Sequence, residues 1–277
     1  MTPEQVEARR REIVERLGPW TAHNVRLAGD VYTMAPGIAG DEIKLRRIVQ
    51  TVADLSGRPL AELRVLDLAC LEGLYAVEFA RHGARVVGVE GRAVNLAKAS
   101  FAKDVLALGN LELRQDDVRN LSRERYGSFD VVLCLGILYH LDAPDLFAFL
   151  ERIGEVCQRF AVIDTHVSLA PEEVRLHGGR EYRGQSYVEH APQATSEEKA
   201  GRLWASLDNP TSFWLTRASL YNALLHSGFT SVLECQLPPE PAKPDDRVTL
   251  VAIKGQRHKL ACAPLADALP LEVPEAG

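Results

Sequence analysis

The strongest constraint on the fold is an alternation of short apolar runs with helical stretches, which begins near residue 63. The apolar runs lack polar residues at alternate positions, which is typical of strands buried on both faces of a sheet. Buried strands that alternate with helices predict parallel crossover units, and therefore a doubly wound α/β sheet. The predicted strands span residues 63–68, 85–89, 111–114, 129–135, 160–164, 231–236 and 247–254.

Helices are predicted between these strands and in a segment that precedes them. They span residues 2–17, 41–55, 74–82, 93–108, 142–157 and 216–227. Thr2, Pro3 and Gln5 mark the start of the first helix, because they fit a capping box with proline in the first turn. We expect an N-terminal helical cap over residues 1–60, followed by one α/β domain over residues 61–255.

Two later segments show no clear helical or strand period. Residues 170–212 are polar and rich in Gly, Arg, Glu and Tyr. A long stretch of this kind inside a compact domain is often a functional lid or insertion, here placed after the fifth strand. Residues 256–277 are rich in Ala, Pro and Glu, which predicts a flexible C-terminal tail.

The composition limits the class of partner. The net charge of −6 argues against the broad basic surface that duplex nucleic acids require, although a local groove for tRNA stays open. No uncharged apolar run reaches the roughly 18 residues that span a bilayer. The five cysteines form no C-x-x-C pair, which favours reduced thiols in a cytoplasmic protein over a disulfide framework or zinc cluster. A homo-oligomer is also possible.

The first predicted strand ends in a turn suited to a nucleotide. Residues 64–73 read Arg-Val-Leu-Asp-Leu-Ala-Cys-Leu-Glu-Gly, an apolar strand with an acid near its end. The backbone N–H groups of such a turn, and the helix that follows, can bind polar ligand groups. A dinucleotide fingerprint needs glycine at positions 69, 71 and 74, where this chain has Ala, Leu and Leu. The spacing therefore argues against NAD; the other interpretation is a plain strand-to-helix turn.

The pattern Asp67-x-Ala69-x-Leu71-x-Gly73 resembles motif I, D-x-G-x-G-x-G, of the class I S-adenosylmethionine (SAM)-dependent methyltransferases. The resemblance implies a Rossmann-like fold with a mostly parallel seven-stranded sheet. It assigns Asp67, Ala69, Cys70, Leu71 and Gly73 to the cofactor site. Leucine replaces glycine at position 71, so we expect the loop to avoid a positive φ there.

An acid also ends the second strand. Glu90 comes about 20 residues after the first loop, where a carboxylate can accept hydrogen bonds from both ribose hydroxyls of a nucleoside. Gly91 and Arg92 follow it and are included in the predicted cofactor site. The other interpretation of Glu90 is a solvated acid at a strand end.

Two more elements follow in the order that the family has. After the third strand, Asp117 and Val118 are implied by the resemblance to contact adenine, with a slip to Asp116 or a plain turn acid as alternatives. Residues 129–142 resemble motif IV, in which the fourth strand ends beside the cofactor. This resemblance adds Cys134, Leu135 and Gly136 to the cofactor site.

His140 is the candidate general base. Methyl transfer from SAM is an in-line displacement, so the acceptor must be aligned and, if it is a hydroxyl, must lose its proton. Histidine accepts a proton near neutral pH. Tyr139 is a second candidate catalytic residue; for His140, a substrate contact and a structural role are the alternatives.

Candidate acceptor contacts lie mostly in the later segments. Arg180 can pair with a carboxylate or phosphate, and Tyr182 and Tyr187 can stack on a ring. The alternatives are ordinary surface arginines and aromatic core residues. The other candidates for substrate binding are Trp20, His166, Glu189 and Trp214.

We predict no metal cofactor. Asp142, Asp164 and His166 are weak candidates for a divalent cation that would orient two substrate oxygens. Oxygen and imidazole ligands from separate loops form no motif, however, so hydrogen-bonding roles are favoured. EDTA is therefore expected to leave activity intact.

Two stretches narrow the resemblance within the superfamily. Residues 135–140, Leu-Gly-Ile-Leu-Tyr-His, are similar to a segment of the tRNA wobble-uridine carboxymethyltransferase group, as is Pro19-Trp20 followed by Gly29 and Thr33. Similar stretches occur in small-molecule methyltransferases of natural-product pathways. We predict methyl transfer from SAM to a small-molecule hydroxyl of a sugar, phenol or secondary metabolite, leaving S-adenosylhomocysteine. The alternatives are a tRNA wobble-uridine modifying enzyme and a SAM-binding regulatory protein without catalysis.

Overall fold

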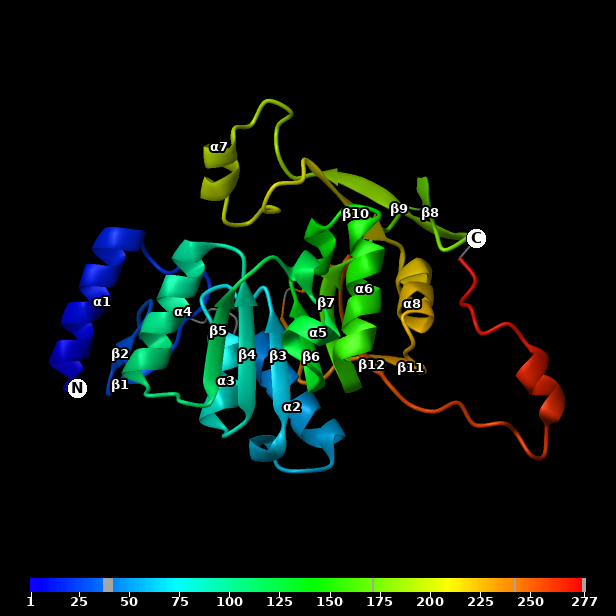
Figure 1. Ribbon diagram of the computed structural model, residues 1–277, viewed down its shortest axis with the longest axis horizontal. Helices are drawn as coiled ribbons and strands as arrows, with labels where there is room; N and C mark the ends of the chain where they lie inside the picture. Colours follow the sequence, from blue (N-terminus) through cyan, green and yellow to red (C-terminus); the bar gives the residue numbers. More distant parts are fainter. Residues whose placement is uncertain (37–41, 171, 242, 276–277) are drawn as a thin grey trace. The chain divides into compact units, whose positions relative to one another are not determined.

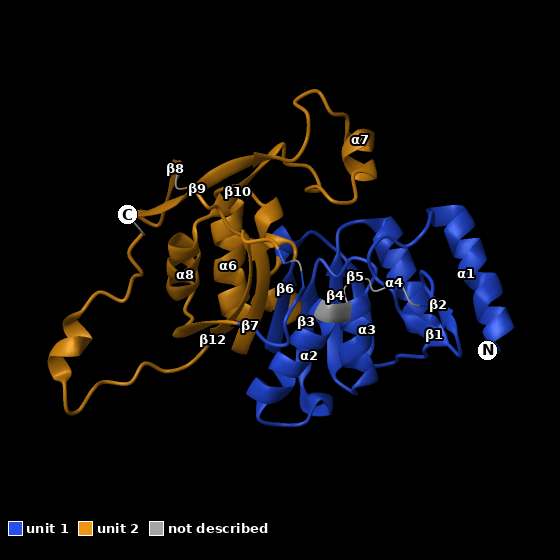
Figure 2. Cartoon of the chain, turned by 180° about the vertical axis from the view of Figure 1, so that it is seen from behind, with its two compact units in different colours: residues 1–120, 129–135, 235–243 blue, residues 121–128, 136–234, 244–277 orange. Residues whose placement is uncertain are grey.

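The chain folds into two compact units. A computed structural model describes residues 1–36, 42–170, 172–241 and 243–275, so the predicted helix start at Asp41 lies outside the described residues (Figure 1). Unit 1 comprises residues 1–120, 129–135 and 235–243, and unit 2 comprises residues 121–128, 136–234 and 244–277 (Figure 2). The units do not follow sequence order, and the domain boundaries at residues 60 and 255 stay a prediction.

Unit 1 contains the parallel part of the sheet. Its strands are β3 (Arg64–Leu68), β4 (Arg85–Glu90), β5 (Leu111–Gln115) and β6 (Phe129–Leu135), in the order β6-β3-β4-β5. The crossover helices α3 (Leu74–Arg81) and α4 (Ala93–Val105) and the short helix η2 (Val118–Asn120) join them. Valine and leucine dominate the buried positions of β3 and β4, as expected for strands covered on both faces.

The N-terminal part of unit 1 is helical, with a small hairpin. It contains α1 (Pro3–Leu17), β1 (Arg26–Ala28), β2 (Val31–Tyr32), α2 (Glu42–Ser56) and η1 (Leu60–Glu62). The predicted capping box is confirmed: Gln5 N donates to Thr2 Oγ1, and Thr2 N donates to Gln5 Oε1. Helix α1 lies beside α4 (Figure 1). The sequence did not predict the hairpin, whose strands are too short to show a period.

Unit 2 contains the antiparallel part of the sheet. Its strands β7 (Cys157–His166), β11 (Ser231–Glu234) and β12 (Arg247–Ile253) are accompanied by η3 (Leu138–His140), α5 (Arg123–Tyr126), α6 (Asp145–Val156) and α8 (Arg217–His226). Strand β12 runs antiparallel to both β7 and β11. The full strand order is β11-β12-β7-β6-β3-β4-β5, so the predicted seven-stranded, doubly wound α/β sheet is confirmed.

The segment over residues 170–212 has regular structure, although its sequence shows no clear helical or strand period. It contains β8 (Glu173–His177), β9 (Arg180–Val188) and α7 (Ser196–Gly201), and β10 (Thr211–Leu215) completes an antiparallel sheet in the order β10-β9-β8. His177 pairs with Arg180 across a two-residue turn, where Gly178 and Gly179 have φ of +55° and +76°. A Gly-Gly pair between two strands is a hairpin signal that the sequence does contain. A lid function for this segment stays a prediction.

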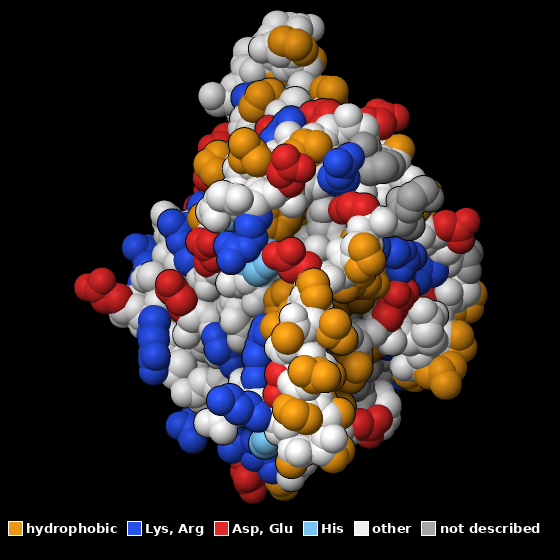
Figure 3. Space-filling model, turned by 90° about the vertical axis from the view of Figure 1, so that its right-hand side faces the viewer, with side chains coloured by type: hydrophobic (Ala, Val, Ile, Leu, Met, Phe, Trp, Pro, Cys, Tyr) orange, Lys and Arg blue, Asp and Glu red, His pale blue; other side chains and the backbone are white. Residues whose placement is uncertain are grey.

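The C-terminal segment is mostly exposed but is tied to α8. It forms one short helix, η4 (Pro264–Ala268), and exposes Leu265, which is 87% accessible. Glu275 Oε1 accepts a hydrogen bond of 2.6 Å from Ser219 Oγ. On the face of the molecule that Figure 3 shows, hydrophobic side chains are gathered in a band. The predicted flexible tail therefore has at least one fixed contact near its end.

Two expectations about the whole chain can be compared with the structure. Within the described ranges, no helix has both the length and the hydropathy of a membrane span. All five cysteines are free, and Cys70, Cys134 and Cys157 are buried.

Candidate cofactor and acceptor sites

The turn after β3 is fixed by backbone hydrogen bonds. Cys70 N donates to Val89 O at 2.9 Å, and Gly73 N donates to Cys70 O at 2.8 Å. Gly73 has a φ of +89°, and a Cβ at this position would lie 2.9 Å from Ala99 Cβ. Glycine is therefore required at position 73 by the backbone conformation and by the close approach of α4.

The expectation for Leu71 is wrong, because the turn does adopt a positive φ there. Ala69 and Leu71 have φ of +54° and +49°. A left-handed conformation costs a non-glycine residue about 1–2 kcal/mol. Leu71 N donates to Glu90 Oε2 at 2.9 Å, and this charge-assisted bond helps to offset the cost. The turn thus has the conformation of a glycine-rich loop without two of its glycines.

The buried carboxylates of Asp67 and Glu90 lie at this turn. Asp67 Oδ2 accepts a hydrogen bond from Ala76 N at 3.0 Å, and burial raises the pKa of Asp67 to about 7, with the Ala76 N–H opposing and Glu90 adding to the rise. Glu90 Oε1 accepts a bond of 2.7 Å from Arg92 N. Burial also raises the pKa of Glu90, and the N–H donors partly oppose that shift.

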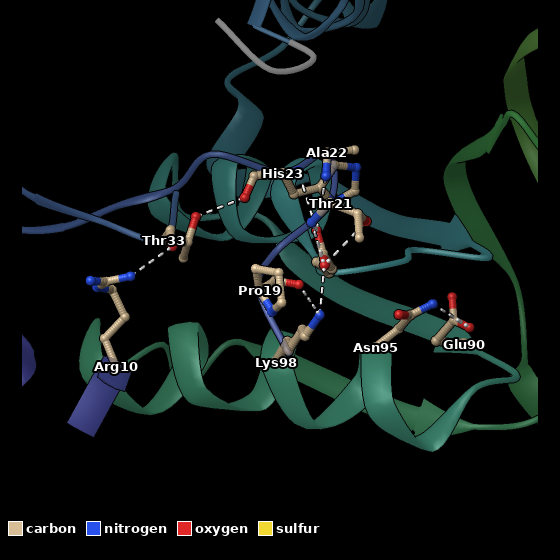
Figure 4. Close-up of polar contacts among 10 residues, drawn as sticks. Arg10, Pro19, Thr21, Ala22, His23, Thr33, Glu90, Asn95 and Lys98 are labelled. Carbon is tan, nitrogen blue, oxygen red and sulfur yellow. Dashed lines mark hydrogen bonds and ion pairs between the residues drawn. The ribbon is translucent and has the colours of Figure 1, made fainter. Parts of the chain in front are cut away.

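Asn95 Oδ1 and Trp20 Nε1 are among the buried polar atoms of unit 1 that have no hydrogen bond to any described residue. Asn95 Nδ2 contacts Glu90 Oε1 at 3.4 Å, so its oxygen is held close to that carboxylate (Figure 4). Buried polar atoms nearly always have a partner in a working protein. An acceptor such as Asn95 Oδ1, held close to a buried carboxylate, fits a polar nucleoside ligand such as SAM.

The residues predicted to contact adenine are held by their own neighbours. Arg119 Nη2 lies 2.6 Å from Asp117 Oδ2, and Asp117 N donates to Asp116 Oδ1 at 2.9 Å. Val118 is buried. A ligand would have to share the Asp117 carboxylate with Arg119, so the adenine contact stays a prediction.

The remaining predicted cofactor residues are at strand ends. Gly91 O accepts a long bond of 3.5 Å from Gln115 Nε2, which joins the ends of β4 and β5. Cys134 and Leu135 end β6, and Cys134 is fully buried. Gly136, in unit 2, has a φ of +85° and donates through its N–H to Asp164 O at 2.8 Å.

In unit 2, His140 and Glu189 form a histidine–carboxylate pair. His140 Nδ1 lies 2.9 Å and 3.0 Å from the two carboxylate oxygens of Glu189. Ser206 N also donates to Glu189 Oε2, at 2.9 Å. Burial raises the pKa of Glu189, but the hydrogen bond and charge of His140, together with further hydrogen bonds such as that from Ser206 N, make the net shift downward. The pair favours a proton on Nδ1, which leaves the Nε2 lone pair to accept a proton.

Around His140 the structure gathers an aromatic cluster of Tyr139, His140, His166, Tyr187 and Trp214. Trp214 stacks on Tyr187 at 4.7 Å and on His166 at 4.9 Å between ring centroids. Tyr139 meets the edges of His166 and Trp214. Trp214 Nε1 donates to Tyr139 O at 2.9 Å, which fixes η3 against β10. The five residues come from four elements, η3, β7, β9 and β10, so only the fold brings them together.

Arg247 of unit 2 contacts two candidate site residues, Asp164 and His166, and the sequence analysis did not single it out. Its guanidinium bonds Asp164 Oδ1 at 2.7 Å and 2.6 Å, and Thr249 Oγ1 bonds the other oxygen at 2.7 Å. Burial and the nearby Arg247 charge both lower the pKa of His166. Burial raises the pKa of Tyr139, which Arg247 opposes. An arginine in a predicted strand carries no signal of this role, because Asp164 is distant in sequence.

Known proteins that are similar to this chain are methyltransferases. Residues 65–159 match the family model described as a methyltransferase domain. The ubiquinone biosynthesis O-methyltransferase of Acinetobacter baylyi is 34% identical over 108 residues, which is 39% of this chain and 43% of that enzyme. The chain therefore spans less than half the length of the curated relatives it matches.

Solved structures extend the similarity over most of the chain. The N-terminal domain of EvdMO1, crystallised in the presence of S-adenosylhomocysteine (SAH) and D-fucose, has a TM-score of 0.70 and 25% identity, and covers 92% of this chain and 98% of that chain. The fold is that of the class I SAM-dependent methyltransferases. The glycopeptide N-methyltransferase MtfA shares this methyltransferase fold at a TM-score of 0.53 and 18% identity, covering 78% of this chain and 91% of that chain.

Three predicted acceptor residues, Trp20, Arg180 and Tyr182, lie outside both the aromatic cluster and the His140–Glu189 pair. Tyr182 is 2% exposed, packs on Phe147 at 4.6 Å and contacts His226 Nδ1 through its hydroxyl at 2.6 Å. Arg180 is exposed at the β8–β9 turn and lies 3.8 Å from Glu272. Trp20 is buried in unit 1. A substrate would have to displace existing contacts to reach Tyr182, so its predicted role gains no support from the structure.

The weak metal candidates already have polar partners. Asp142 Oδ2 accepts a hydrogen bond from Thr211 Oγ1 at 2.5 Å, and Asp164 is paired with Arg247. The Arg247 cation also contacts His166 Nε2 at 3.3 Å, and a positive charge there opposes a second cation. Within the described residues, no group of three His, Cys, Asp or Glu side chains is arranged to hold a metal ion.

Proposed function

We propose that the chain transfers a methyl group from SAM to a hydroxyl oxygen of a small molecule, with His140 as the general base. The observation that carries this proposal is the His140–Glu189 pair, with separations of 2.9 Å and 3.0 Å. A buried carboxylate that orients a histidine is a recurrent arrangement for proton removal from a hydroxyl. The matched relative from Acinetobacter baylyi is an O-methyltransferase, which agrees with a hydroxyl acceptor.

The cofactor is assigned to the turn after β3 and the end of β4 in unit 1. Glu90 accepts hydrogen bonds from three N–H groups, and its carboxylate oxygens retain lone pairs that can accept hydrogen bonds from ribose hydroxyls. When bound, SAM supplies a methyl group attached to a positively charged sulfur. The unpartnered Asn95 Oδ1 and Trp20 Nε1 add an acceptor and a donor for its polar groups.

His140 removes the acceptor proton in this proposal. Glu189 holds the Nδ1–H, so Nε2 takes the proton as the acceptor oxygen forms its bond to the methyl carbon and the carbon–sulfur bond breaks. Glu189 then stabilises the imidazolium that results, because its lowered pKa keeps it ionised. Alignment of the acceptor oxygen with the methyl group supplies the rest of the rate acceleration.

The aromatic cluster supports a ring-shaped acceptor. Tyr187 is 45% exposed and stacks on Trp214, so an aromatic face is accessible at this end of unit 2. Aromatic faces pack against sugar and phenol rings. The EvdMO1 domain was crystallised in the presence of a sugar, D-fucose, which favours sugars as the first acceptors to test.

The test is a transfer assay with SAM labelled in its methyl group. The full chain is incubated with a panel of sugars, phenols and secondary metabolites, and separately with bulk tRNA, and His140→Ala is run in parallel. The proposal expects label in a small molecule, lost in His140→Ala. Label in tRNA would favour the wobble-uridine alternative instead. Tight SAH binding without any transfer would favour a regulatory protein.

A further inference from the structure

Glu72 is the most heavily bonded buried carboxylate of unit 1, and the cofactor assignment does not use it. Its side chain is 0% exposed. Its oxygens accept hydrogen bonds from the backbone N–H groups of Thr21 at 2.9 Å, Ala22 at 3.3 Å and His23 at 3.2 Å. Figure 4 shows these three residues converging on one carboxylate. Glu72 belongs to the turn after β3, so the turn holds a segment from about 50 residues earlier in the chain.

Lys98 completes this buried cluster. Its Nζ lies 3.2 Å from Glu72 Oε1 and donates to Pro19 O at 2.6 Å, and the Lys98 side chain is 1% exposed. A buried ion pair is stable only when its remaining donors and acceptors are also satisfied. Here the backbone of residues 19–23 satisfies both partners, so this segment is a structural component of the pair rather than a loose loop.

The segment also delivers a side chain to the start of α3. Leu74 N donates to His23 Nδ1 at 3.1 Å. Gly73, at the N-cap position of α3, has no side chain to perform this function. His23 is 3% exposed, and Thr33 Oγ1 donates to its carbonyl oxygen at 2.7 Å (Figure 4). The first N–H of α3 is therefore capped by a residue 51 positions away.

From these contacts we infer that Glu72 is a positioning residue for the cofactor: it anchors residues 19–23 so that His23 caps α3 and fixes the turn over residues 69–73. The inference rests on the proposed function, because it assigns the cofactor to this turn. A preorganised turn binds its ligand with a smaller loss of conformational entropy, because the turn is already ordered. Loss of the anchor is then expected to weaken cofactor binding although Glu72 need not touch the cofactor.

The test compares two properties of the full chain, the affinity for SAH by calorimetry and backbone hydrogen exchange by mass spectrometry. Glu72→Gln keeps the shape of the side chain but turns an NH₂ group towards N–H donors. We expect SAH binding about tenfold weaker, since charge-assisted bonds are replaced by a neutral amide. Peptides covering residues 19–25 and 69–77 should exchange faster, while β6 stays protected. Glu78→Gln, a change at a partly exposed position on α3, is the matched control and should alter neither property.

A second pair of variants tests the cap without the buried charge. His23→Ala should weaken SAH binding about fivefold, as expected for a lost cap. His23→Asn supplies a side-chain oxygen near the position of Nδ1 and should restore affinity to about twofold of the wild type. A general loss of packing would affect both His23 variants alike, so restoration by asparagine is specific to capping. This pair also decides the matter if Glu72→Gln does not fold.

The possible failures are distinguishable. Unchanged exchange of residues 19–25 in Glu72→Gln would overturn the anchor. Faster exchange with unchanged SAH affinity would overturn the link to the cofactor. Wild-type protein that binds no SAH would overturn the proposed function and the cofactor link with it, while the exchange data would still decide whether Glu72 anchors the segment.

Discussion

The carboxylates of the two candidate sites are held in different ways. In unit 1 the carboxylates of Asp67, Glu72 and Glu90 take hydrogen bonds mainly from backbone N–H groups. In unit 2 the pairs are between side chains: His140 with Glu189, and Arg247 with Asp164. Backbone donors are fixed by the path of the chain, whereas side-chain pairs depend on two residue types at two distant positions.

From this difference we expect unit 1 to bind the cofactor and unit 2 to determine the chemistry of the acceptor. Backbone-bonded carboxylates suit a cofactor that is the same in every member of a family, because the turn itself sets their position. Side-chain pairs and stacked rings can change by substitution without altering the chain path, which suits an acceptor that differs between enzymes. The following predictions test whether cofactor binding and acceptor chemistry separate between the two units in this way.

The largest effect is expected for His140→Ala. Loss of the base should lower kcat at least 100-fold, within the range for general base catalysis. The affinity for SAH, measured by calorimetry, should stay within about twofold of the wild type, since His140 belongs to unit 2. Turnover at the wild-type rate would refute the role of His140, and a large loss of SAH affinity would break the division between units.

Glu90→Ala should weaken SAH binding by tenfold or more. The change removes the acceptor of Leu71 N and the carboxylate proposed to bind the ribose hydroxyls. Calorimetry provides the measurement, with Glu112→Ala, an exposed acid on β5, as the matched control. Equal affinity in the Glu90 variant would remove this residue from the cofactor site.

Glu189→Gln should lower kcat about tenfold and leave SAH affinity unchanged. Glutamine cannot stabilise the imidazolium as the ionised carboxylate does. Steady-state kinetics with the identified acceptor measure the effect, and Glu181→Gln, an exposed position on β9, is the control. If kcat were unaffected, the pair would be structural rather than functional.

Asp67→Asn should change how stability depends on pH. Burial raises the pKa of Asp67 to about 7 from its ordinary value of 3.8, so the protonated form is favoured in the folded state. The wild type therefore loses stability through this group as pH rises from about 4 through about 7. Thermal unfolding should show the gain from Asp67→Asn largest at pH 8 and smallest at pH 4. A gain independent of pH would contradict the raised pKa.

The smallest effect is expected for removal of divalent metal. Activity in EDTA should stay within about twofold of the untreated enzyme, because Arg247 neutralises Asp164 and lies against His166. Loss of activity that Mg²⁺ restores would show that unit 2 uses a cation with its acceptor. The control is the same assay with EDTA already saturated by Mg²⁺.

The sequence predicted the sheet better than the insertion. Strands β3, β4, β6 and β7 each contain a run of buried apolar residues, and such runs have few alternatives to a buried strand. Strands β8 and β9 alternate exposed and covered residues with many charges, so only the Gly178-Gly179 turn signalled them. Leu71 was misjudged because a local preference against positive φ is weaker than the hydrogen bonds that the turn forms.

What the sequence determined by itself is what neighbouring residues decide: the helix cap at Thr2, the order of strands and helices along the chain, and a tight turn at Gly73. Tertiary structure alone decided which distant side chains meet. Glu72 reaches His23 across 49 residues, and His140 meets Glu189 across the same separation. No local pattern specifies such pairs, because the free energy that selects them comes from burying both partners together, and that happens only once the fold has formed.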